Sequence, residues 1–148
     1  MGYTHYYSSV RLTSELASAA AKIAAVTPVA LRGWDGTGAP VITPDLISFN
    51  GDGATGDDCE TFLLTPNPEH PYQGCKTNLR PYDTVVVAIL VAAFAQEQTG
   101  IDSDGDWDDW QEGIALYEAA VAPLAPTVKD ALFMQLSGIH PDTAVAPW

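Results

Sequence analysis

The sequence predicts a single α+β domain, residues 1–148, in which a small antiparallel sheet packs on a buried central helix. Three observations favour this fold. The interior of a run from Tyr82 to Gln98 is apolar on every side, which is typical of a helix at the centre of a domain. Amphipathic helical patterns stand before and after that run, and short strand-like segments occupy the chain between them. With 47% hydrophobic residues, the chain is long enough to bury one core of this kind.

The first two elements are expected to be a strand and a helix. Residues Gly2–Ser9 are rich in tyrosine and serine, a composition typical of a half-buried strand. Thr13 or Ser14 can then cap a helix over 14–26, whose apolar positions recur on one face until Thr27-Pro28 stops the pattern. We therefore expect this helix to face the core.

The middle of the chain, 29–74, predicts short strands joined by tight turns, because glycine, proline and aspartate become dense there. We place strands near 29–31, 46–49 and 60–64. The segment Thr65–Pro71 contains three prolines, which remove hydrogen-bond donors from any β-ladder, and it is expected to be an exposed loop.

Helices dominate the last third. Pro81 suits a first helical turn and Gly100 suits a helix end, so we place the central helix at about 82–98. The β-branched residues at 85–87 leave a strand start open as an alternative, although the length of the run favours a helix. The remaining elements are expected to be a short strand, helices near 106–122 and 126–136, and an extended tail at 139–148.

The charge balance excludes two classes of partner. Nineteen Asp and Glu residues against six Lys and Arg give a formal net charge of −13, which repels nucleic-acid phosphates and anionic membranes. The longest apolar stretch, Val85–Ala95, is too short to span a bilayer, and no secretion signal precedes the first strand. We therefore expect a cytoplasmic protein whose Cys59 and Cys75 are free thiols. Lys76 beside Cys75 would lower the pKa of that thiol.

The most specific clue to a ligand is a short basic segment before the central helix. Lys76 and Arg80 are two of only six basic residues, and both precede a helix start, where free N–H groups attract anions. Thr77 can add a neutral hydrogen bond. Alternatively, Arg80 forms an ordinary ion pair with Asp83 or Glu60.

Three other groups of residues have candidate chemistry. His5 among tyrosines suits either a general base or stacking on a ligand ring, or else a buried, hydrogen-bonded histidine. Asn50 and Glu60 suit recognition of hydroxyls or an amide edge. The acidic run 102–109 resembles a calcium loop, but the two most diagnostic positions of that pattern hold Trp107 and Gly113, so we predict no metal and explain the acids by a helix start.

Several short motifs, taken in order, resemble a family of small proteins found in bacteriophages and bacteria. The resemblance implies an intracellular accessory protein with its polar motif residues gathered at one site. The chain departs from the family's pattern at Gly74, where an aromatic residue is usual, and at Arg80, where lysine is usual. The motifs are Met1–Tyr6, Trp34–Gly38, Phe49–Gly51, Glu60–Phe62, Cys75–Thr77, Arg80–Asp83 and Ser103–Asp106.

The expected function is binding of a small anionic ligand, a nucleotide or nucleotide-sugar, without a cofactor. Aromatic side chains would stack on the base and cations would hold the phosphate. Within the resemblance, such a protein would sequester a nucleotide-derived immune signal. Two alternative functions stay open. One is a hydrolase or lyase that acts on the same molecules through His5 or Glu60, and the other is an acidic interaction protein that mimics DNA. The sequence also leaves open whether the protein forms a homo-oligomer. The predicted site comprises His5, Tyr6, Trp34, Asn50, Glu60, Lys76, Thr77, Arg80, Tyr82 and Asp83.

Overall fold

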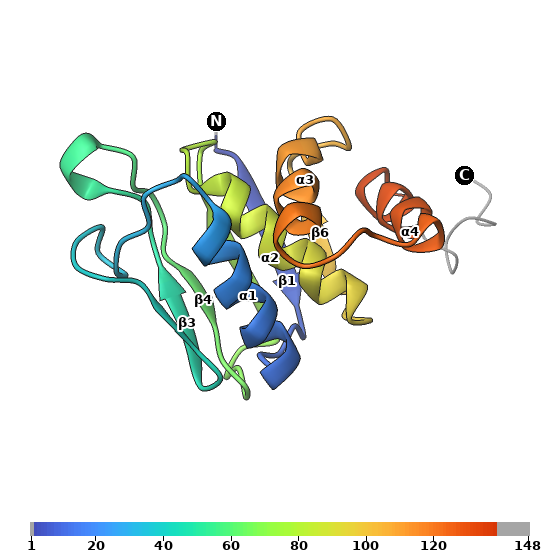
Figure 1. Cartoon of the computed structure of the whole chain (residues 1–148), viewed down its shortest axis with the longest axis horizontal. Coiled ribbons are helices and arrows are strands. Elements are labelled where there is room, and N and C mark those ends of the chain that lie inside the picture. Colours follow the sequence, from blue (N-terminus) through green and yellow to red (C-terminus); the bar gives the residue numbers. More distant parts are fainter. Residues whose placement is uncertain (1, 139–148) are drawn as a thin grey trace.

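Helix α2, Asp83–Ala95, is the centre of the fold (Figure 1). The structure, a computed structural model, describes residues 2–138, and ten of the 13 residues of α2 are buried in it. Helices α1 and α3 pack against α2 and against each other. Because α2 is surrounded on all sides, its sequence is apolar all round, and the predicted central helix is confirmed. The other helices are α1, Ser14–Val26; α3, Gln111–Ala120; and α4, Pro126–Leu136.

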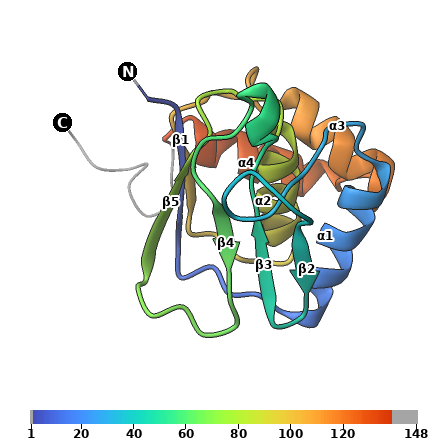
Figure 2. The same cartoon turned by 90° about the vertical axis from the view of Figure 1, so that its left-hand side faces the viewer.

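The strands form two small antiparallel sheets of three strands each. One has the order β5-β1-β6 and the other the order β2-β3-β4. Figure 2 shows β4, β3 and β2 side by side with α2 behind them, so the molecule is an α+β domain with its sheets against the helices. The strands are β1, Thr4–Ser8; β2, Val41–Thr43; β3, Leu46–Phe49; β4, Phe62–Leu64; β5, Tyr72–Lys76; and β6, Ile101–Ser103.

Helix α1 begins as its sequence predicts. The Thr13 side chain accepts a hydrogen bond from the backbone N–H of Leu16, and this satisfies one of the unpaired donors at the helix start. Leu16, Ala20 and Ile23 then point into the core. The amphipathic pattern of this helix is therefore confirmed.

Helices α2 and α3 approach closely at a glycine. A Cβ atom placed on Gly113 would lie 2.2 Å from Cγ1 and 2.6 Å from Cβ of Val87, distances that no packed structure tolerates. The absence of a side chain at Gly113 therefore sets how near the two helices lie.

Some predicted boundaries were wrong. Residues 29–31 form no strand; the neighbouring Arg32 makes only an isolated bridge with Asn50. Strands β2 and β5 were not predicted, because Gly74 and flanking prolines make β5 resemble a loop in sequence. The helix expected over 106–122 begins only at Gln111. The expected extended tail, 139–148, lies outside the described residues.

No helix within residues 2–138 is both long enough and apolar enough to cross a membrane.

Candidate functional site

A buried polar network centres on His5, whose side chain is fully enclosed on β1. Its Nε2 lies 2.6 Å from Oδ1 of Asp83 on α2, and its Nδ1 lies 2.8 Å from Oγ of Ser103 on β6. The Thr77 hydroxyl donates a short hydrogen bond to the same Asp83 oxygen. The fold thus unites three predicted site residues, His5, Thr77 and Asp83, and adds Ser103.

The hydrogen bonds of Ser103 define where the protons of this network lie. Its Oγ accepts from the indole N–H of Trp110 at 3.1 Å and from the backbone N–H of Gly105 at 2.8 Å, which uses both lone pairs. The Ser103 hydroxyl proton must therefore point to Nδ1 of His5. His5 is then neutral, with its proton on Nε2, from which it donates to Asp83.

Ser103, His5 and Asp83 stand in the order of a hydrolytic triad, but their surroundings favour a structural role. A nucleophilic serine needs a lone pair free for attack, and Ser103 has both occupied. The rings of Tyr3 and Trp110 pack edge-on against the His5 imidazole, with centroids 5.2 and 5.5 Å away. The network joins β1, β6, α2 and the segment after β5 through hydrogen bonds among the side chains of Ser103, His5, Asp83 and Thr77.

Sequence reasoning missed Ser103, Tyr3 and Trp110 as partners of His5. Ser103 lies 98 residues from His5, and no local spacing reveals such a contact. The only available signal was that Ser103 begins one of the short motifs.

Asn50 and Trp34 belong to a second, separate polar cluster. The Asn50 amide donates to the carbonyl oxygens of Trp34 and Cys59, and its Oδ1 accepts from the backbone N–H groups of Gly51 and Cys59. All of its hydrogen-bonding capacity is directed into the protein, so Asn50 holds the neighbouring turns together. The Trp34 side chain instead lies 68% exposed.

Glu60 and Tyr82 hold the segment before β4 against β5. Glu60 Oε1 accepts from the backbone N–H of Lys76 at 2.8 Å, and the Tyr82 hydroxyl donates to the carbonyl oxygen of Glu60 at 2.6 Å. Tyr82 is fully buried, and this burial, followed by the nearby Cys75 and Cys59, raises its pKa. Both contacts stabilise the fold.

Cys75 is a protected thiol, contrary to the sequence-based expectation. Burial, followed by the charge of Glu60, raises its pKa to about 12, because a thiolate would have to form away from water. The nearby Lys76 does not offset this, so the expected lowering of the Cys75 pKa was wrong.

We therefore expect the two cysteines to react with a thiol reagent at different rates. At pH 8 the partly exposed Cys59 should react with a thiol reagent in the native protein, whereas Cys75 should react only after unfolding. Mass spectrometry of the native and urea-unfolded protein after a short labelling pulse measures this. Equal labelling of both thiols in the native protein would contradict it.

The two residues of the basic segment are Lys76, the last residue of β5, and Arg80 beyond it. Neither makes an ion pair within the part of the chain that the structure describes. Neither Lys76 nor Arg80 lies within 4.0 Å of a carboxylate there. The alternative in which Arg80 pairs with Asp83 or Glu60 was wrong, because Asp83 binds His5 and Glu60 binds a backbone N–H. Two cations in a chain of net charge −13 are thus available to a ligand.

The turn that carries Arg80 has an unusual backbone. Asn78 and Leu79 both have positive φ, 50° and 58°, a conformation that costs non-glycine residues free energy. Tyr3 holds this turn: its carbonyl oxygen accepts from the N–H groups of Thr77 and Asn78, and its own N–H donates to Asn78 Oδ1. The Leu79 side chain remains 59% exposed.

The outer face of the β5-β1-β6 sheet carries two exposed tyrosines, Tyr6 and Tyr72. Tyr6 of β1 pairs with Gly74 of β5 on one side and with Asp102 of β6 on the other. Side chains alternate along a strand, so Tyr72 and Lys76 share this face with Gly74 and are diagonal neighbours of Tyr6. Both tyrosines also line a groove of about 320 Å³, whose other lining residues are Tyr7, Ser8, Gln73, Gly100, Ile101, Asp102 and, from α4, Gln135.

The acidic run 102–109 is explained by its own backbone contacts. Asp106 and Asp109 accept hydrogen bonds from each other's backbone N–H, and Asp104 accepts from the N–H of Thr4. Within residues 2–138, no three His, Cys, Asp or Glu side chains come together as a metal site would require.

Comparisons with protein-family models, with curated proteins and with solved structures found no match. The site must therefore be interpreted from its own geometry. Of the ten predicted residues, Tyr6, Lys76 and Arg80 have side chains available to a ligand, and Trp34 is exposed on a different turn. His5, Asn50, Thr77, Tyr82 and Asp83 are buried, and Glu60 binds the backbone of β5.

Proposed function

We propose that this protein binds a small nucleotide-type ligand on the outer face of the β5-β1-β6 sheet. The observation that carries the proposal is the strand register, which places two exposed tyrosines and Lys76, a lysine without an ion pair in the described residues, around a glycine on one face. This surface supplies the two interactions that a nucleotide needs, stacking for its base and positive charge for its phosphate.

Stacking would come from Tyr6 and Tyr72, which are 47% and 82% exposed. Gly74 has no side chain, and the ring of Tyr6 leans over it, with Cδ1 3.5 Å from the place where a Cβ would stand. The ring of Tyr6 therefore lies against the backbone of β5, and Tyr6 and Tyr72 both line the groove. An aromatic base inserted there would exclude water from both rings.

Charge would come from Lys76 at the other end of β5. Lys76 stands four positions after Tyr72, which corresponds to roughly 13 Å of extended chain, enough for a base at one end and a phosphate at the other. Arg80, on the turn that follows, can bind a second anionic group. Asp102, on the far side of Tyr6, presents a carboxylate that accepts hydrogen bonds from ribose hydroxyls.

Titration calorimetry with a panel of nucleotides, cyclic nucleotides and ADP-ribose derivatives tests this proposal. We expect saturable binding of at least one, weakened about tenfold or more in Tyr72→Ser, since loss of base–aromatic stacking costs about 1–3 kcal/mol. Lys76→Ala should weaken binding similarly and reduce its dependence on salt.

Two matched variants control for composition. Trp34→Ala also removes an exposed aromatic ring, and Lys22→Ala also removes a cation without an ion pair in the described residues, yet both should leave affinity unchanged. Equal losses in the control and test variants, or no binding by a folded sample, would overturn the proposal.

As part of this proposal, the protein sequesters its ligand and does not convert it, because the buried Ser103–His5–Asp83 network lacks an available nucleophile. Ligand released by denaturation should be chromatographically identical to the ligand added. A new product would favour the hydrolase or lyase alternative.

A further inference from the structure

The outer face of the β2-β3-β4 sheet carries apolar residues where an antiparallel sheet that faces water normally carries polar ones. The strand register aligns Val41 of β2 with Ser48 of β3, and Ser48 with Leu63 of β4. The next row contains Ile47 and Leu64, which are fully buried, so the first row points away from the core. Alternation adds one further pair to this uncharged surface, which we call the outer apolar face. Its residues are Val41, Thr43, Leu46, Ser48 and Leu63.

The turn that carries Trp34 extends this face beyond the end of the sheet. The carbonyl oxygen of Trp34 accepts from Nδ2 of Asn50, just after β3, at 3.1 Å, and from the hydroxyl of Thr61, just before β4, at 2.6 Å. Because Thr61 lies two residues before Leu63, the two side chains share one side of the strand, so the turn lies on the outer side of the sheet. Figure 2 shows this turn, in blue, at the upper end of β2, β3 and β4.

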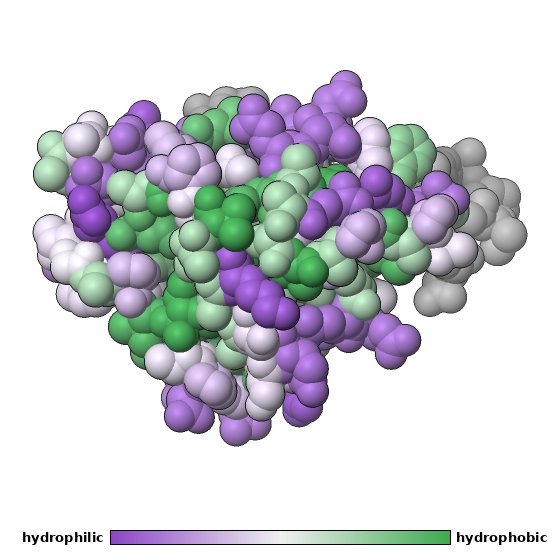
Figure 3. All heavy atoms as spheres, in the orientation of Figure 1, coloured by the Kyte–Doolittle hydropathy of each residue, from purple (hydrophilic) through white to green (hydrophobic). Residues whose placement is uncertain are grey.

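The larger side chains of the outer apolar face are open to solvent. Val41 is 39% exposed and Leu63 is 41% exposed, with the small Ser48 buried between them. Figure 3 shows hydrophobic side chains gathered over β2 and β3, at the lower left of the molecule. Single exposed apolar side chains are normal on a protein surface, but a group of them on one face indicates a surface that another protein covers.

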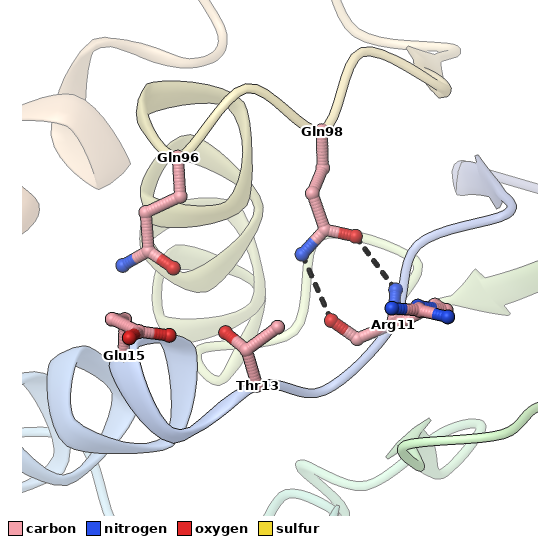
Figure 4. Close-up of a pocket in the computed structure, with 5 residues that line it drawn as sticks. All are labelled: Arg11, Thr13, Glu15, Gln96 and Gln98. Atoms are coloured by element: carbon pink, nitrogen blue, oxygen red, sulfur yellow. Dashed lines mark hydrogen bonds between the residues drawn. The ribbon is translucent and has the colours of Figure 1, made fainter.

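The groove between the start of α1 and the end of α2 differs in character (Figure 4). It is lined by the charged residues Arg11 and Glu15, and the Gln98 amide is already bonded to both backbone groups of Arg11, at 2.7 and 2.8 Å. A partner that covered this groove would remove water from two charged side chains, which is unfavourable. Covering the outer apolar face removes water from none.

A second copy of this chain is the partner that the charge of the face favours. Two copies, each of net charge −13, repel one another, and the repulsion is weakest where the touching surfaces carry no charge. A two-fold axis brings the same patch of each copy together, so an apolar, uncharged patch is complementary to itself. Pairing through the edge of β2 is less suitable, because Pro40 and Pro44 flank this strand and cannot donate to a β-ladder.

We propose that the protein forms a two-fold symmetric dimer in which the outer apolar faces of two copies pack against each other. The two sheets lie about 10 Å apart, as in a β-sandwich, and each contributes Val41, Leu63 and Trp34. The exposed Asp35 and Asp45, at the two ends of the face, stay at the rim in contact with water. Three short strands cover roughly 200 Å², against about 800 Å² per partner in a standard interface, so the dimer is weak.

Sedimentation equilibrium of the full chain, from about 10 μM to about 1 mM, tests the proposal. We expect the mass to rise with concentration from the 15.7 kDa of one chain toward twice that value. Added salt should strengthen the association, because it screens the repulsion between two acidic copies. A contact made by ion pairs would instead weaken in salt, so the direction of the salt effect distinguishes the two kinds of interface.

A matched pair of variants tests which surface is used. Leu63→Lys places a charge in the middle of the outer apolar face and should raise the dissociation constant of the dimer about tenfold or more. Leu79→Lys makes the same change in net charge at another exposed leucine, on the turn before α2, and should leave the association unaffected by comparison. Trp34→Ala should also weaken the dimer about tenfold or more, because exposed tryptophans are common anchors of interfaces.

The same variants keep this proposal separate from nucleotide binding at the β5-β1-β6 sheet. Trp34→Ala should lose association and keep its nucleotide affinity, whereas Tyr72→Ser should lose nucleotide affinity and keep its association. Thermal melting followed by circular dichroism checks that dilute Leu63→Lys is folded. If it is not, Val41→Thr, which keeps a β-branched side chain in β2, takes its place and should weaken the dimer.

Three results would each overturn the proposal. The first is a mass that stays at that of one chain at every concentration and salt, which would leave the face to a different protein. The second is association that weakens as salt is added. The third is an equal effect of Leu63→Lys and Leu79→Lys on the dissociation constant.

Discussion

Replacing Asp83 by alanine is expected to lower the free energy of unfolding by about 2–5 kcal/mol. Oδ1 of Asp83 is the shared acceptor of two donors, the Nε2–H of His5 and the hydroxyl of Thr77. Alanine would leave both buried donors without a partner and would open space at the start of α2. Urea denaturation followed by circular dichroism measures the loss.

Two further variants make this expectation specific. Asp83→Asn keeps a carbonyl oxygen that can accept from His5 and Thr77, so it should be less destabilising than alanine. Asp108→Ala removes an exposed carboxylate from the neighbouring acidic run and should change stability by no more than about 0.5 kcal/mol. A loss in Asp83→Ala no greater than that in Asp108→Ala would show that the network contributes little.

The second large effect is expected at Gly113. Alanine there should improve the intrinsic helix propensity of α3 by about 1 kcal/mol, but its methyl group would overlap the side chain of Val87. Val87 is β-branched and packed in the core, so relief requires α2 and α3 to move apart. We expect a net loss of about 1–3 kcal/mol in the free energy of unfolding.

A double-mutant cycle tests whether this contact is the cause. Val87→Ala alone should be destabilising because it leaves a cavity, but combined with Gly113→Ala the cavity receives the new methyl group. The double variant should therefore be more stable than the sum of the single losses predicts. If the two losses in the free energy of unfolding simply add, the loss in Gly113→Ala has a cause other than the contact with Val87.

The helical half of the fold could be predicted because its signals are local. The apolar run of α2 and the capped, one-sided pattern of α1 depend on neighbours a few residues apart. Strand β5 could not be predicted in the same way, because its residues satisfy no alternation of their own. Gly74 is tolerated in β5 because β1 pairs with this strand along its length.

In the candidate site, too, the local signals could be predicted from the sequence and the long-range contacts could not. The sequence placed His5, Thr77 and Asp83 among ten candidate site residues, but it gave neither their mutual contacts nor the direction in which their side chains point. Inward direction follows from the pairing of β1 with both β5 and β6, which buries His5 and exposes Tyr6. The paired strand residues are 64 (Ser8 and Tyr72) to 98 (His5 and Ser103) positions apart, and such pairing leaves no trace in local spacing. The exposed face of Tyr6, Tyr72 and Lys76 therefore emerged only from the structure.

The position of β1 in the middle of its sheet also constrains the order in which the chain acquires structure. This strand precedes the other five in the sequence, yet its two partners are β5 and β6, and the second of them ends at Ser103. The 95 residues that follow Ser8 up to Ser103 (103 − 8) must be made before Tyr6 and Tyr7 are paired on both sides. Contacts of such long range close slowly, because the entropy of a long loop is lost before they form. Completion of the β5-β1-β6 sheet is therefore a late event, and until then β1 remains an unpaired, tyrosine-rich segment.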